Sequence, residues 1–156
     1  MSKFRTRQGV IIDDLKKYVE DWLADKPEAA VYVGCDSQAH GKTVNYAVSV
    51  CMYEKGKGGH IITKRTTETK TKTGKWDRSV NTKRLWVEVE KSTDVADELK
   101  GIGVPITIHV DYNSKPEELS NELYGSGIGY ALEKGYQAVG KPDAWAASKA
   151  ADKGAR

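Results

Sequence analysis

Three strand-like segments joined by very short turns place the strongest constraint on how this chain folds. Residues 30–37 and 43–54 carry alternating or continuous apolar side chains, and residues 60–72 continue as a more polar strand. Only the turns 39–42 and 55–59 separate them. Strands joined by turns of this length pair antiparallel, so the segment is predicted to form a three-stranded meander.

The rest of the chain alternates helices and strands. Helices are predicted over about 82–100, 114–135 and 143–152, and strands over 106–113 and 136–139. Strands separated by helices are typical of parallel pairing. We therefore expect an α/β fold with a mixed five-stranded sheet, three antiparallel strands followed by parallel additions, flanked by helices.

An extra N-terminal helix is predicted to precede this sheet, over about residues 12–26. Its start can be capped by Asp13 or Asp14, and Pro27 ends it. Its apolar stripe, at helical spacing, consists of Leu15, Tyr18, Val19, Trp22 and Leu23.

Length and composition indicate one domain over residues 1–156, with its core at about 30–153. The longest apolar runs are strand-sized, so no membrane span is expected. The polar N-terminus predicts no signal peptide, and Cys35 and Cys51 lack the spacing of a metal or redox site. These features favour a cytoplasmic protein with reduced cysteines.

Four acidic residues stand out from the others by their positions. Asp36 and Asp111 each end a strand, and Glu88 borders the sheet-facing side of the predicted helix 82–100. A carboxylate inside a strand needs a partner or a cation, because burial of an unpaired charge is costly. Asp143 begins the last predicted helix, where a capping role is favoured about two to one over a catalytic one.

Taken together, these four acids predict a carboxylate cluster at one end of the sheet. Such a cluster stays ionised only with hard cations, and ligands that are all oxygen suit Mg²⁺ or Mn²⁺. Two such ions can activate a water molecule and stabilise the leaving oxygen in phosphodiester cleavage. His109, two residues before Asp111, is either a proton-transfer group or a satisfied buried histidine.

A local basic segment contrasts with the nearly neutral net charge of +3. Eight basic residues lie between Lys64 and Arg84, interrupted by only two acids. This segment is either a solvated strand edge protected by lysines or a surface that follows a phosphate backbone. On the second interpretation, the nucleic-acid-binding residues are Lys70, Lys72, Lys75 and, near Asp143, Lys141.

The element order and the acid placement resemble the ribonuclease H-like superfamily. Within it, the chain resembles the YkuK family of bacterial and phage proteins, through Val33-Gly34-Cys35-Asp36-Ser37-Gln38, Leu85-Trp86-Val87-Glu88-Val89, Ile108-His109-Val110-Asp111-Tyr112-Asn113 and the run from Lys141 to Ser148, followed by Ala151-Asp152-Lys153. The resemblance implies a ribonuclease H-like fold and, as catalytic and metal-binding acids, Asp36, Glu88, Asp111 and Asp143.

The leading functional hypothesis is a nuclease that uses two Mg²⁺ or Mn²⁺ ions and acts on RNA, an RNA–DNA hybrid or branched DNA. The alternative is a catalytically silent module that kept the fold and binds nucleic acid or another protein. A small accessory protein within a larger assembly is a third possibility.

Overall fold

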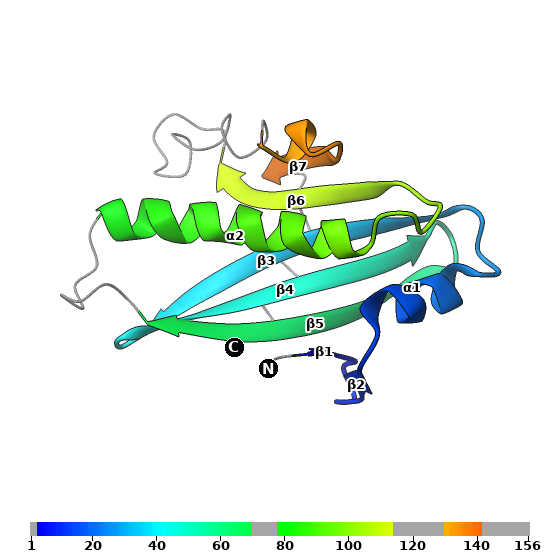
Figure 1. The fold of residues 1–156 in the computed structure, drawn as a ribbon, viewed down its shortest axis with the longest axis horizontal. Coiled ribbons are helices and arrows are strands. Elements are labelled where there is room, and N and C mark those ends of the chain that lie inside the picture. Colours follow the sequence, from blue (N-terminus) through cyan, green and yellow to red (C-terminus); the bar gives the residue numbers. More distant parts are fainter. Residues whose placement is uncertain (1–2, 70–77, 114–129, 142–156) are drawn as a thin grey trace.

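The central feature of the computed structural model is a mixed sheet (Figure 1). The structure describes residues 3–69, 78–113 and 130–141. Within these ranges the sheet has seven strands in the order β2-β1-β5-β4-β3-β6-β7. In chain order the strands are Phe4–Arg5 (β1), Ile11–Ile12 (β2), Ala29–His40 (β3), Thr43–Glu54 (β4), Gly58–Thr69 (β5), Ile106–Asn113 (β6) and Gln137–Lys141 (β7).

The three long strands β3, β4 and β5 form the predicted antiparallel meander. The pairing of β3 with β4 runs without interruption from Ala29 opposite Glu54 to His40 opposite Thr43. The pairing of β4 with β5 is equally regular and ends at Thr69. Gly41 makes the first turn possible, because its φ of 55° is in the left-handed region that favours glycine.

The parallel half of the sheet is also as predicted. β6 pairs parallel with β3, and β7 pairs parallel with β6. The helix α2 (Arg78–Glu98) connects β5 to β6 and runs along the sheet in Figure 1. A long crossover is what parallel pairing of β6 with β3 requires. The α/β class and the mixed sheet are therefore confirmed.

The expected number of five strands is wrong. Two short strands at the N-terminus, β1 and β2, pair with each other and extend the sheet beyond β5. Phe4 and Ile12 anchor this hairpin in the core, with only 4% and 6% of their surface exposed. Strands of two residues are too short to show an alternating pattern, so spacing in the sequence did not reveal them.

The N-terminal helix also differs from the prediction. Helix α1 covers Leu15–Leu23 rather than residues 12–26, and it follows β1 and β2 instead of opening the fold. Its N-cap is Asp14, whose side chain accepts a hydrogen bond from the backbone N–H of Lys17 at 3.1 Å. Ile12, expected at the start of the helix, is held in β2 by its pairing with Phe4.

The two faces of the sheet carry different side chains, because residues alternate along each strand. On β3, Ser37 donates a hydrogen bond to Glu88 of α2, so the odd-numbered residues of β3 point toward that helix. We call this side the helix-covered face. The other side carries the even-numbered residues of β3, including Tyr32 and Asp36, and we call it the Tyr32 face.

Helix α1 packs on the helix-covered face as well. The hydroxyl of Tyr18 lies 2.7 Å from Nε2 of His60 in β5. Through the register of the meander, His60 lies opposite Met52, and Met52 lies opposite Val31. These three residues share a face, and so α1 and α2 lie on the same side of the sheet.

The hydrophobic core fills the space between this face and the two helices. Its fully buried members include Val19, Val31, Val33, Val48, Val50, Met52, Ile62, Val89, Leu99 and Ile108. Among the described residues, no helix is long and apolar enough to cross a membrane.

Two of the predicted helices lie wholly or mostly outside the described residues. Of the helix expected over 114–135, residues 130–133 are helical, and the chain leaves the helix through Gly135, whose φ is 93°. The helix expected over 143–152 falls entirely outside the described part of the chain.

The cap of α1 provides a test of this fold. Asp14→Ala should lower the free energy of unfolding by about 1 kcal/mol, because it leaves an N-terminal amide of the helix without its acceptor. Asp13→Ala is the matched control, since the ion pair of Asp13 with Lys3 is exposed and should matter little. Urea denaturation of both variants measures the difference. Equal losses would show that Asp14 is not the cap.

Candidate functional site

Two of the predicted acids lie at the carboxyl ends of neighbouring parallel strands. The register of β3 with β6 places Gly34 opposite His109. Asp36 and Asp111 each come two residues later in their strands. Both acids therefore lie near the carboxyl ends of two neighbouring strands, as the sequence predicted. Asp36 is half-buried there.

Tyr32 and His109, which precede the two acids in their strands, share one face of the sheet. The rings of Tyr32 and His109 lie 5.0 Å apart between centroids, so even-numbered residues of β3 share a face with odd-numbered residues of β6. Asp36, four residues after Tyr32 in the regularly paired β3, lies on that same face. The pairing of β6 with β7 shifts register between His109 and Asn113, so alternation counted from His109 does not assign Asp111 to a face. The side chain of Asp111 lies outside what the structure describes.

The third acid, Glu88, reaches β3 from the helix. Glu88 is only 4% exposed, whereas Glu90 is half-buried, so the predicted phase of the helix is confirmed. Its Oε2 accepts a hydrogen bond from the hydroxyl of Ser37. The hydroxyl of Ser92, one turn further along α2, donates to the backbone carbonyl of Glu88 at 2.9 Å.

Asp36 and Glu88 consequently approach the end of β3 from opposite faces. Ser37, and not Asp36, is the strand residue that contacts Glu88, and its neighbour Asp36 alternates to the other side. The described part of the chain contains no group of three or more acidic, histidine or cysteine side chains able to hold a metal ion. The convergence of Asp36, Glu88 and Asp111 on one metal-binding point stays a prediction.

Two titratable groups next to these acids, Cys35 and His109, are uncharged at neutral pH. Burial, together with the nearby negative charge of Glu88, raises the pKa of Cys35 well above its usual value, so its thiol stays protonated. Burial lowers the pKa of His109 to about 4, so its imidazole is neutral at neutral pH. His109 is 2% exposed and contacts Tyr32, an arrangement that favours a buried structural histidine over a proton-transfer group.

A comparison of the chain with models of protein families gives a result that agrees with this fold. The family model described as ribonuclease H-like matches residues 10–156. The chain belongs to the ribonuclease H-like family. The mixed sheet with its flanking helices fits a ribonuclease H-like fold, and the family indicates a nuclease or another nucleic-acid-related function in general terms. A comparison with curated proteins found no match.

Several predicted residues of this ribonuclease H-like chain lie outside the described ranges. These include Asp143 and the basic residues Lys70, Lys72 and Lys75. For Lys141 the structure describes the backbone, and this backbone pairs in β7 with Asn113 of β6. Lys141 therefore lies close to the strand end that carries Asp111.

Lys91 is a charged residue near the site that the pattern of the sequence did not reveal. Its ammonium lies 5.1 Å from the ring centroid of Tyr46 and 3.8 Å from Oε1 of Glu68. Tyr46 is the strand partner of Ser37, and Lys91 is three residues after Glu88 on α2. Residues three apart on a helix share a face, so the spacing from Glu88 could have predicted that Lys91 lies near the site.

The contact between Ser37 and Glu88 predicts a specific loss of stability. Ser37→Ala should lower the free energy of unfolding by about 1–3 kcal/mol, because a buried carboxylate loses a hydrogen-bond donor. Ser49→Ala is the matched control, since Ser49 is also buried but its hydroxyl lies 3.4 Å from the neutral hydroxyl of Thr63. Urea denaturation should show the larger loss for Ser37→Ala. A larger loss for Ser49→Ala would contradict the assignment.

Proposed function

We propose that this chain is a divalent-metal-dependent nuclease that hydrolyses phosphodiester bonds in RNA, an RNA–DNA hybrid or branched DNA. The observation that carries the proposal is the parallel register of β3 and β6. It brings the ends of the strands that carry Asp36 and Asp111 next to each other, in a ribonuclease H-like chain. Acids so placed are natural ligands for a cation shared between two strands.

The chemistry of the donors fits Mg²⁺ or Mn²⁺. The four proposed ligands are carboxylates, and hard divalent cations prefer oxygen ligands. Asp36 and Asp111 would be the central ligands, Glu88 would bind from the helix side directly or through water, and Asp143 would complete the second site. When bound, two such ions activate water and stabilise the leaving oxygen of a phosphodiester.

The protein's own residues would bind and orient the substrate around these acids. Lys70, Lys72, Lys75 and Lys141 would neutralise phosphates of the backbone. His109 would act by packing and hydrogen bonding, because its lowered pKa leaves it without positive charge at neutral pH. Ser37 would hold Glu88 in place at the end of β3.

Within the family, we propose that the chain belongs to the YkuK-like group. The support is the set of motifs around Asp36, Glu88 and Asp111, together with the Lys141-Pro142-Asp143 run and its downstream Ala151-Asp152-Lys153. In this structure the first three motifs fall on β3, α2 and β6, the elements that meet at the proposed site.

A catalytically silent binding module is the second candidate, and one observation favours it. Asp36 and Glu88 approach β3 from opposite faces, whereas a two-metal centre needs its carboxylates to share the same ions. On this alternative, Glu88 is a structural residue that fixes α2 to β3, and the chain binds nucleic acid or another protein without catalysis.

The acids at the strand ends provide the test of catalysis. Asp36→Asn and Asp111→Asn should each abolish Mg²⁺- or Mn²⁺-dependent cleavage while leaving the fold intact, because asparagine keeps the size of aspartate without its charge. Asp94→Asn, on the exposed side of α2, is the matched control and should cleave like the unmodified protein. The assay follows labelled single-stranded RNA, RNA–DNA hybrid and branched DNA, with either metal or with EDTA.

Two other outcomes of this assay have clear meanings. Cleavage that persists in Asp36→Asn and Asp111→Asn would reveal a contaminating nuclease. An unmodified protein that binds these substrates but cleaves none of them with either metal would support the silent module.

The basic segment predicts an effect on binding alone. Changing Lys70, Lys72 and Lys75 together to alanine should weaken nucleic-acid binding and reduce the slope of log affinity against log salt by about one unit per lysine. Lys55→Ala is the control, because it changes an exposed lysine in the turn after β4, at the opposite end of β5. Fluorescence anisotropy over a salt series measures both. An equal slope change in the control would refute the assignment.

A further inference from the structure

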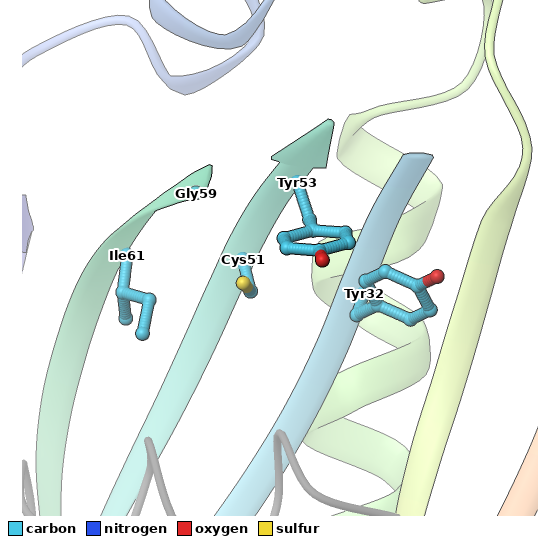
Figure 2. A pocket seen from close by; sticks show the side chains of 5 residues that line it. All are labelled: Tyr32, Cys51, Tyr53, Gly59 and Ile61. Atoms are coloured by element: carbon cyan, nitrogen blue, oxygen red, sulfur yellow. The ribbon is translucent and has the colours of Figure 1, made fainter. Parts of the chain in front are cut away.

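The Tyr32 face changes in character along β3 and β4. Near the amino end of β3 it is apolar, and Figure 2 shows the residues around a hollow there: Tyr32, Cys51, Tyr53, Gly59 and Ile61. Beyond Asp36 the same face becomes polar. Gln38 of β3 is the strand partner of Asn45 of β4, and Asn45 is the partner of Thr67 of β5. We call these three residues the polar row.

The polar row lies directly beside the proposed metal-binding acid of β3. Asp36 and Gln38 are consecutive on this face, because Ser37 between them points toward α2. Two residues of a strand span about 7 Å. The row is half-buried on β3 and β4 and exposed on β5, so a ligand that reaches Asp36 can also contact it.

One hydrogen bond orients the side-chain amide of Asn45. The hydroxyl of Thr67 donates to Oδ1 of Asn45 at 2.8 Å. The amide oxygen is therefore turned toward β5, and the amide nitrogen lies on the side of β3, where Gln38 is the strand partner. An amide nitrogen only donates hydrogen bonds. With the amide of Gln38, the row thus offers two sets of N–H donors beside Asp36.

The charges around the polar row suit an anion. Residues 37–46 contain no Asp or Glu, and Lys42 is exposed in the turn between β3 and β4. Arg65 of β5 is exposed and lies on the same face as the row. The acid of β5, Glu68, lies on the other face, where it pairs with a lysine of α2 at 3.8 Å. Side-chain amides and arginines are among the groups that contact phosphates in nucleic-acid complexes.

We propose that Gln38 and Asn45 donate hydrogen bonds to a phosphate of the substrate strand that neighbours the phosphodiester held at Asp36. Arg65 and Lys42 add positive charge on either side of this contact. The two amides bind the strand and leave the bond that breaks to the acids. This inference rests on the proposed function, and it names the group of the substrate that the polar row recognises.

Binding without cleavage tests this proposal separately from catalysis. The full chain is titrated in EDTA against fluorescein-labelled single-stranded RNA and RNA–DNA hybrid. Gln38→Ala and Asn45→Ala should each weaken binding by about ten-fold, because each removes a hydrogen bond to a charged group. Gln38→Glu should weaken binding further, since a carboxylate repels the phosphate that the amide attracts.

Gln8 provides the matched controls, because it is exposed in the turn between β1 and β2, at the edge of the sheet. Gln8→Ala and Gln8→Glu repeat the two changes away from the polar row and should bind like the unmodified protein. Thermal unfolding of each variant shows whether the fold is intact. Equal weakening by the changes at Gln8 and Gln38, or undiminished binding by Gln38→Ala and Asn45→Ala, would overturn the proposal.

Uncharged linkages identify the group that the row contacts. The phosphates of the single-stranded RNA are replaced one at a time by methylphosphonates, which lack the negative charge. At one position the loss of affinity should be smaller for Gln38→Ala than for the unmodified protein, because the contact is already missing. Losses that add at every position would overturn the proposal. Binding of poly-glutamate but of no nucleic acid would also overturn it, and would assign the row to acidic segments of a partner protein.

The outcomes for the polar row and for catalysis are distinguishable. A protein whose nucleic-acid binding depends on Gln38 and Asn45 but which cleaves nothing with Mg²⁺ or Mn²⁺ retains the phosphate contact and loses the nuclease proposal. A protein that cleaves with an unchanged KM in Gln38→Ala and Asn45→Ala retains the nuclease proposal and loses the phosphate contact.

Discussion

The parallel pairing of β3 with β6 is the constraint on which the candidate site depends. Four consecutive residue pairs, from Val31 with Ile106 to Gly34 with His109, set the register between the first long strand and the strand after the crossover helix. A shift of one residue would move every side chain of β6 to the other face. The buried Ile108 and Val110 resist such a shift, because they would leave the core for the Tyr32 face. The cost of moving apolar groups thus holds β6 in register beside β3 as far as Gly34 and His109, two residues before the acids.

The helix-covered face and the Tyr32 face carry different groups. The first holds the apolar core, and it contains a buried carboxylate, Glu88, that is satisfied in part by the hydroxyl of Ser37. The second carries Asp36, and it also contains the buried residues Ala47, Ser49 and His109. Glu88 reaches the same strand end through the other face, and this makes it both a structural and a catalytic candidate.

The sequence was most informative where one physical signal dominated. The bounds of β4 and β6 follow the predicted segments 43–54 and 106–113, because turns or helix ends interrupt the apolar pattern at both sides. The orientation of Glu88 followed from helical phase. β1 and β2 were missed, because pairing with distant residues and the burial of Phe4 and Ile12 stabilise them, rather than any local pattern. The sequence also did not predict the face on which Asp36 lies, because alternation along one strand does not say which side a helix will cover.

The most direct test of the site is the position of a cation in crystals of the full chain soaked with Mn²⁺. Anomalous scattering should show manganese at the carboxyl ends of β3 and β6, with carboxylate oxygens of Asp36 and Asp111 at about 2.0–2.2 Å, near the distances of small hard cations. Asp36→Asn crystals treated in the same way should lose that density. Manganese bound only elsewhere, or an Asp36 carboxylate turned away from Asp111 with no ion between them, would contradict a metal-dependent nuclease site.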